Sequence, residues 1–197
     1  MTISHSDLDA FSHASLKLYS PELTAETYAA HCVGFLRGLV PADMVSVADM
    51  DTRAGTLGVD FSDLDAVLPR LVEGFGRTMG RYRLFNWDPM VNEGRPFFRS
   101  DFFTARQFRD LDVYAESFSL RGWNNHCAVH VPTDDHHVLF IGLERSGTVD
   151  YTERDRAVLT LAQAHLANAR RRAHARAKIR KELPIDPRDF ERAGFSP

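Results

Sequence analysis

The sequence predicts an α+β fold, in which an antiparallel sheet is flanked by helices and followed by a long C-terminal helix. Strand-like segments occur as two pairs, 44–48 with 56–61 and 124–131 with 137–143, and a polar turn joins the members of each pair. Helical segments precede and separate the pairs, and a further helix begins near residue 152. This order favours helices packed on a central antiparallel sheet.

The composition indicates a globular protein with a substantial core. The chain has 197 residues, of which 44% are hydrophobic and 14 are Phe, so global disorder is not expected. The longest apolar run, 138–141, is far too short to span a membrane. The N-terminal residues lack the basic and apolar regions of a signal peptide. Cys32 and Cys127 make no disulfide framework. We therefore expect a cytoplasmic protein without membrane attachment.

Two helices are expected before the first strand pair. Ser6 is predicted to cap the first, which runs to about residue 19 and is broken by Pro21. Its apolar positions are Leu8, Phe11, Leu16 and Tyr19. Thr24 is predicted to cap the second, which ends before Pro41. Its apolar face holds Tyr28, Cys32, Phe35, Leu36 and Leu39 at helical spacing.

A third helix is expected to end near Met79. Ser62 has the position of a helix cap, but Pro69 is not tolerated in a helix interior, so the helix either kinks or begins nearer Leu68. The following stretch, 81–122, is rich in aromatic residues and resists assignment beyond two short helices.

These short helices are expected around 104–110 and 113–120. Ser100 or Asp101 is predicted to cap the first of them, and this structural role is favoured over ligand binding for Asp101.

The C-terminal helix has a strong start signal. Thr152 and Asp155 form an N-cap pair, and Glu153 adds negative charge at the positive end of the helix dipole. Between residues 157 and 181 the helix carries seven of the 24 Lys and Arg residues and no acid. This basic stretch has two interpretations: contact with nucleic acid, or a solvated face that pairs with acids of its own domain.

Apolar residues alternate along this helix at three-four spacing, namely at Leu159, Ala162, Leu166, Ala169 and Ala173. Small residues at such positions let a second helix approach closely, so a parallel homodimer is one interpretation. The alternative is that these residues pack on the sheet of their own chain.

Two segments resemble a known family. Residues 100–114 (SDFFTARQFRDLDVY) look like the "SDF…R.F…..Y" segment in the amino-terminal domain of LuxR-type helix-turn-helix regulators. Residues 149–169 resemble the "F(S/T)ERDR.LL.LL.PHL..A" helix of the same domain. Tyr151 replaces the usual Phe, and Ala164 stands where Pro usually precedes His-Leu. The order of elements also matches a GAF-like domain, and the resemblance spans about residues 40–197.

The resemblance implies a ligand-sensing and dimerising domain of a LuxR-type transcription regulator. Residues 1–183 would form the GAF-like sensor and dimerisation domain, and 184–197 would be the linker towards an absent helix-turn-helix domain. Phe195-Ser-Pro197 looks like the first residues of that DNA-binding part. Without a recognition helix, this chain alone is expected to bind no specific nucleic-acid sequence.

Two histidines and a cysteine on one strand raise the question of a metal site. His126 and His130, with His136 and His137 nearby, are candidate ligands. On a strand, His126 and His130 lie about 13 Å apart, too far for one ion without another element. We therefore expect no metal, and instead a half-buried strand whose inward residues are Cys127, Val129 and Val131.

Catalysis has little support, because the sequence lacks a Gly-rich phosphate loop, HExxH and GxSxG. We expect neither an enzyme nor a cofactor. GAF-like enzymes and ligand-free protein-interaction modules remain alternatives to the sensor. Substrate turnover would distinguish an enzyme, and a filled interior under residues 95–120 would indicate an interaction module.

The aromatic stretch is the candidate ligand site. Its residues are Trp87, Arg95, Phe97, Phe98, Arg99, Phe102, Phe103, Tyr114, Phe118 and Trp123. Ligand sites are mostly apolar with a few placed polar groups, so a small apolar or aromatic ligand is expected, with an arginine available for an acceptor group. The alternative is that these aromatics only form the core between the sheet and this stretch.

Overall fold

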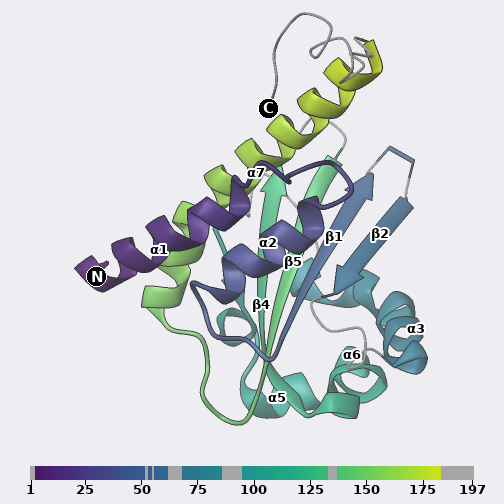
Figure 1. Ribbon diagram of the computed structural model, residues 1–197. Helices are drawn as coiled ribbons and strands as arrows, with labels where there is room; N and C mark the ends of the chain where they lie inside the picture. Colours follow the sequence, from purple (N-terminus) through teal and green to yellow (C-terminus); the bar gives the residue numbers. More distant parts are fainter. Residues whose placement is uncertain are drawn as a thin grey trace, which may run out of the picture.

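The computed structural model describes residues 3–51, 53–54, 56–61, 68–85, 95–132 and 137–182. The chain forms three layers, with a five-stranded antiparallel sheet between two layers of helices (Figure 1). This is the α+β architecture predicted from the order of the segments.

Five strands form the sheet in the order β2-β1-β5-β4-β3. They are β1 (Met44–Asp51), β2 (Thr56–Phe61), β3 (Phe97–Phe98), β4 (Trp123–Pro132) and β5 (His137–Ser146). Both predicted hairpins are confirmed, β1 with β2 and β4 with β5. Because β5 also pairs with β1 along its length, the two hairpins join into one continuous sheet.

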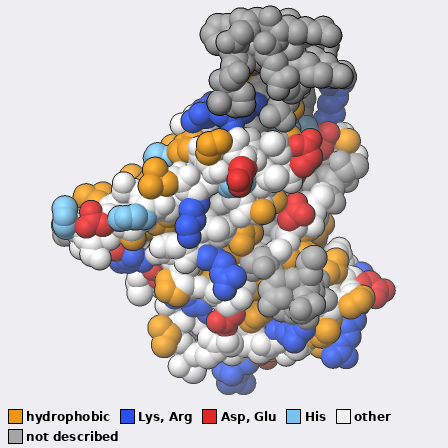
Figure 2. All heavy atoms as spheres, viewed as in Figure 1, with side chains coloured by type: hydrophobic (Ala, Val, Ile, Leu, Met, Phe, Trp, Pro, Cys, Tyr) orange, Lys and Arg blue, Asp and Glu red, His pale blue; other side chains and the backbone are white. Residues whose placement is uncertain are grey.

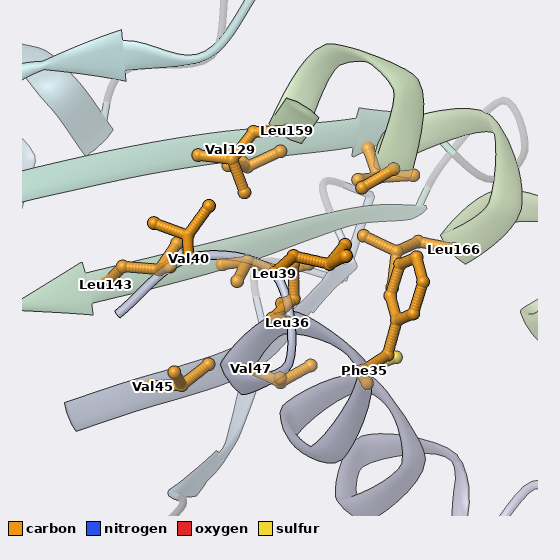
Figure 3. Packing of buried hydrophobic residues seen from close by; sticks show 14 of the residues in the cluster. Phe35, Leu36, Leu39, Val40, Val45, Val47, Val129, Leu143, Leu159 and Leu166 are labelled. Atoms are coloured by element: carbon orange, nitrogen blue, oxygen red, sulfur yellow. The ribbon is translucent and has the colours of Figure 1, made fainter. Parts of the chain in front are cut away.

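Three helices cover one face of the sheet, namely α1 (His5–Leu18), α2 (Tyr28–Arg37) and α7 (Glu153–Glu182). Alternate residues of the strands, including Val45, Val129 and Leu143, point into this layer (Figure 3). They meet Phe35 from α2 and Leu159 from α7 in a fully buried core.

Short elements cover the opposite face. They are α3 (Pro69–Thr78), η1 (Met79–Arg81), η2 (Arg83–Phe85), η3 (Arg99–Asp101), α5 (Ala105–Arg109), α6 (Asp112–Glu116) and η4 (Phe118–Arg121). The helix predicted before Met79 begins at Pro69, where proline needs no backbone hydrogen-bond donor. Its alternative start at Ser62 lies outside the described residues.

The second layer corrects the expectation for β4. His126 and His130 are both only 1% exposed, so this strand is buried on both faces rather than half-buried. Cys127, Val129 and Val131 do face the α1–α2–α7 layer, as predicted. On the face covered by the second layer, His126 packs against Phe118 of η4 and His130 against Phe140 of β5, which the strand's own sequence cannot reveal.

Helix starts show three further corrections. Ser4, not Ser6, caps α1. Leu8 and Leu16, which were predicted to lie on the apolar face of this helix, are exposed. α2 begins after Thr27, because the Thr24 hydroxyl accepts a hydrogen bond from the Thr27 amide in the preceding turn. Thr104, rather than Ser100 or Asp101, caps α5.

The start of α7 is as predicted. The Thr152 hydroxyl accepts a hydrogen bond from the Asp155 amide at 3.2 Å, and the Asp155 carboxylate accepts one from the Thr152 amide at 3.0 Å. The three-four alternation along α7 packs on its own domain, because all five residues are fully buried: Leu159, Ala162, Leu166, Ala169 and Ala173. This face of α7 therefore cannot be the predicted dimer seam.

Part of the basic stretch is engaged within the domain. The buried Arg170 guanidinium lies 2.7 Å from the Asp49 carboxylate of β1. Arg171 and Arg172 are exposed. In the space-filling view, Lys and Arg side chains gather near the C-terminal end of α7 (Figure 2).

The described helices include none that is long and apolar enough to cross a membrane. The linker predicted at 184–197 lies outside the described residues.

Candidate ligand-binding pocket

A pocket of about 210 Å³ lies between the sheet and the second helical layer. Its apolar lining comprises Met44, Ala48, Val59, Phe61, Leu71, Val72, Phe75, Met79, Phe85, Phe118, Trp123 and Phe140. A surface depression beside Pro21 and Arg176 has a larger volume, about 550 Å³, but exposed side chains form most of its wall. The smaller pocket is the better candidate site, because ligand sites are concave and mostly apolar.

Three strands form the floor of this pocket. Side chains two residues apart on a strand share a face, which brings Ser46 and Ala48 from β1, His126 from β4, and Phe140 and Glu144 from β5 to the same surface. The sheet register places His126 directly opposite Glu144. Backbone pairing therefore fixes the position of each of these side chains.

The polar groups of the floor converge over Gly142. A methyl group added to this glycine would lie 2.6 Å from the Ser46 hydroxyl, 2.7 Å from the Glu144 Oε1 and 3.2 Å from the His126 Nε2. Any residue with a side chain would displace these groups. The absence of a side chain at Gly142 thus lets three polar side chains from three strands share one spot in an otherwise apolar pocket.

Several polar atoms of the pocket lack partners. The Glu144 Oε2, the His126 Nε2 and the hydroxyl of Ser117 are buried without a hydrogen-bond partner among the described residues. The His126 Nε2 lies 3.7 Å from the Glu144 Oε1, which is too long for a hydrogen bond. Unpaired buried polar atoms cost free energy and are rare in proteins, so their presence around one pocket suggests a missing partner.

His126 is held by its other ring nitrogen. The His126 Nδ1 and the Tyr82 hydroxyl are 3.0 Å apart and form a buried hydrogen bond, and the two rings stack at 5.5 Å. Burial lowers the pKa of His126 to about 3, and the neighbouring His130 contributes to the shift. The imidazole is therefore neutral at physiological pH, with its Nε2 directed to the polar spot.

Glu144 is an acid in an apolar environment. Its side chain is 7% exposed, and burial raises its pKa to about 8 against the opposing effect of a backbone hydrogen bond. The pocket lining includes no Lys or Arg among the described residues. At neutral pH the carboxyl group is therefore mostly protonated, because no positive charge compensates its ionised form.

The described aromatic residues of the predicted site divide into three groups. Phe118 and Trp123 line the pocket. Phe97, Phe102, Phe103 and Tyr114 pack in the same aromatic cluster without lining the pocket. Phe98 faces the opposite side of the sheet, in the core with α7. Trp87 lies outside the described residues.

The two predicted arginines lie elsewhere. Arg95 is exposed, whereas Arg99 is buried and donates to the Asn125 side chain at 2.7 Å and to the Asp150 carboxylate at 3.0 Å. Its charge is therefore matched inside the protein. Arg99 thus holds the start of the aromatic stretch on the sheet rather than facing the pocket.

Arg156 ties the aromatic stretch to α7. Its guanidinium donates to the Asp101 carboxylate at 2.8 and 3.0 Å and to the Pro96 carbonyl, and it lies 4.0 Å from the centre of the Phe98 ring. Asp101 also accepts a hydrogen bond from the Phe98 amide. The carboxylate predicted to cap a helix therefore anchors this stretch to the first turns of α7.

Sequence reasoning did not find Ser46, Ser117 or Glu144, and it treated His126 only as a metal candidate. Glu144 is the first charged residue after the apolar run of β5, and this position could have marked it as a candidate site residue. Within the described part of the chain, no group of three or more His, Cys, Asp or Glu side chains is placed to hold a metal ion. Both cysteines are buried and free.

The sequence matches no protein-family model and no curated protein. Solved structures nevertheless share the fold. The ligand-binding domain of VqsR from Pseudomonas aeruginosa superposes with a TM-score of 0.59 at 12% identity, covering 86% of this chain and 99% of that one.

Two further structures extend the comparison. The N-acylhomoserine lactone dependent LuxR family transcription factor CepR2 from Burkholderia cenocepacia has a TM-score of 0.54 at 14% identity, covering 84% of this chain and 93% of that one. A GAF domain from a phosphoenolpyruvate-protein phosphotransferase of Coxiella burnetii has a TM-score of 0.54 at 15% identity, covering 89% and 98%. The chain therefore has the fold that GAF domains share with the ligand-binding domains of LuxR-type regulators.

Proposed function

We propose that this chain is the ligand-sensing domain of a LuxR-type transcription regulator, with DNA binding supplied by sequence outside it. The pocket carries this proposal. A volume of about 210 Å³ exceeds the roughly 150 Å³ that suffices to bind benzene in a protein interior. A ligand-free interaction module would instead be expected to have a filled interior. The N-acylhomoserine lactone dependence of CepR2 supports a small, largely apolar ligand by analogy of fold alone.

The signal from the pocket would pass to α7 through the aromatic stretch. Phe118 of this stretch lines the pocket together with Trp123 at the start of β4, and Arg156 ties the same stretch to α7 through Asp101. A ligand that repositions the pocket wall would therefore change contacts at the start of α7, the helix that leads towards the proposed DNA-binding part. The coupling follows from contacts alone and needs a functional test.

Filling the pocket should prevent ligand retention with little cost to the fold. Ala48 lines the pocket, whereas Ala128 lies on the same face of the sheet in close packing. Ala48→Leu should change stability by less than about 1 kcal/mol, whereas Ala128→Leu should cost about 1–3 kcal/mol by overpacking. Urea unfolding measures both effects.

The same variant tests the function. Native mass spectrometry of protein purified from its own host should detect a bound small molecule in the wild-type chain and none in Ala48→Leu. Equal destabilisation by the two leucines would show that the pocket is not a usable space. Conversion of the retained molecule into a product would indicate the alternative enzyme function.

Homodimerisation is part of the proposal, but through a different surface from the one predicted. The exposed face of α7 includes Leu161, which is 43% exposed, and Ala164. We expect a dimer by light scattering that Leu161→Glu converts to a folded monomer, because an unpaired charge is costly to bury at an interface. A wild-type chain that stays monomeric at high concentration would contradict this expectation.

A further inference from the structure

The polar groups on the floor of the pocket restrict the class of ligand that it can bind. This inference rests on the proposed sensing function. The buried Glu144 carboxyl group has one oxygen without a partner among the described residues. No Lys or Arg side chain lines the pocket in the described part of the chain. The carboxyl group is thus placed to receive a positive charge or a strong N–H donor from a bound molecule.

Aromatic rings line the same pocket as this carboxyl group. Phe118, Trp123 and Phe140 line the pocket together with Glu144. Phe118 also lies 5.2 Å from the ring of His126, the residue paired with Glu144 across the sheet. Aromatic faces attract cations, most strongly where water is excluded. A buried acid together with several rings therefore favours a cationic group over an anion, which would be repelled once Glu144 ionises.

A ligand with a neutral hydroxyl group would satisfy the free hydrogen-bonding atoms of the pocket, but it would use neither the charge of the Glu144 carboxylate nor the faces of the aromatic rings.

The remaining polar atoms of the pocket suit an ammonium group. His126 Nε2 and the Ser117 hydroxyl are also without partners among the described residues, and both groups can accept N–H bonds in one of their hydrogen arrangements. An ammonium group has three donors, so it can pair with Glu144 and still donate to a further acceptor of the pocket.

We propose that the pocket binds a small, largely apolar molecule carrying one protonated amine, with the amine paired to Glu144 and the apolar body against Phe118, Trp123 and Phe140. The pocket volume of about 210 Å³ accommodates a single aromatic ring with a short side chain. When the ammonium group binds, the Glu144 carboxyl group loses its proton to solvent and forms the ion pair.

The affinity should depend on pH in one direction. Burial raises the pKa of Glu144 to about 8, so binding of the cation below this pH must displace a proton. Among the described residues, His126 faces Glu144 on the neighbouring strand, and Tyr82, Cys127 and Tyr151 interact with it electrostatically. All four groups are neutral at pH 7, because burial lowers the pKa of the histidine and raises those of the other three. Affinity should therefore rise from pH 6.5 towards pH 8.

Three matched probes test the proposal by isothermal titration calorimetry: 2-phenylethylamine, 2-phenylethanol and phenylacetate. We expect the amine to bind at least about tenfold more tightly than the alcohol at pH 7.5, and the anion not to bind. Amine affinity should increase roughly tenfold from pH 6.5 to pH 7.5, with about one proton released, because each unit of pH changes the cost of ionising Glu144 by a factor of ten.

Glu144→Gln should weaken amine binding at least about tenfold and change alcohol binding less than about twofold. The exposed Glu22→Gln serves as the matched control and should change neither. Equal binding of amine and alcohol, unaffected by Glu144→Gln but abolished by Ala48→Leu, would overturn the amine assignment while leaving the sensing pocket intact. Failure of all three probes to bind at millimolar concentration would also overturn the assignment.

Discussion

Glu144→Gln is expected to remove a loss of stability that the wild-type protein shows as the pH rises from about 7 to 8. Burial raises the pKa of Glu144 from 4.5 to about 8, so in this window the folded chain keeps a proton that the unfolded chain has released. Stability then falls with rising pH by up to about 1.4 kcal/mol per pH unit. The amide in the variant does not titrate, so this slope should disappear.

The window is chosen so that one group dominates. Burial lowers the pKa values of His126 and His130 from 6.5 to about 3 and about 4. In the unfolded chain these histidines titrate near pH 6.5, so they stabilise the folded state increasingly as pH rises through that value, and most of this increase is complete above about pH 7. Urea unfolding of wild type, Glu144→Gln and the control Glu22→Gln at several pH values measures the slopes. Parallel curves for wild type and Glu144→Gln would show that this carboxyl group is not buried as described.

The second large effect is expected at Gly74. A methyl group added here would lie 2.3 Å from the Glu116 carbonyl oxygen of α6, which is backbone and cannot move aside without shifting the helix. Gly74→Ala should destabilise the domain by about 1–3 kcal/mol, because it pushes α3 away from α6. Since α3 contributes Leu71 and Phe75 to the pocket wall, the same change should weaken ligand binding.

Gly76, two residues along the same helix, provides the control. A methyl group at Gly76 would meet no atom within 4 Å. Gly76→Ala should therefore stabilise the domain by roughly 0.5–1 kcal/mol, because alanine loses less backbone entropy in a helix. Thermal and urea unfolding of the two variants should give opposite signs. If both alanines stabilise the domain, the close approach of α3 and α6 is not a packing constraint.

Elements set by local chemistry could be predicted from the sequence. Thr152 and Asp155 cap α7 as expected, and Pro69 marks the start of α3. The first helix shows the limit of this reasoning. Ser4 and Ser6 are each followed by an aspartate three residues later, so both fit a capping box. Asp7 also pairs with Arg154 of α7, and such a tertiary contact is not visible in the local pattern.

The candidate site was only partly predictable for a related reason. The density of aromatic residues pointed to Phe118 and Trp123, which do line the pocket. Glu144 and His126 meet only because β4 and β5 pair in one register, and a shift of one residue would turn each to the opposite face. The fourth component of the spot is the absence of a side chain at Gly142. Its importance depends on Ser46 and His126, which are distant in sequence, as well as on Glu144 of the same strand.

The position of β5 in the sheet has a consequence for synthesis on the ribosome. This strand lies between β1 and β4, yet it follows both of them in the chain. Until residue 146 has left the exit tunnel, β1 and β4 each present an open backbone edge to solvent or to other nascent chains. Such edges promote aggregation. The β4 edge is closed by a local hairpin, but the pairing of β1 with β5 spans nearly one hundred residues, so it forms late. The nascent domain therefore depends on rapid insertion of a single late strand.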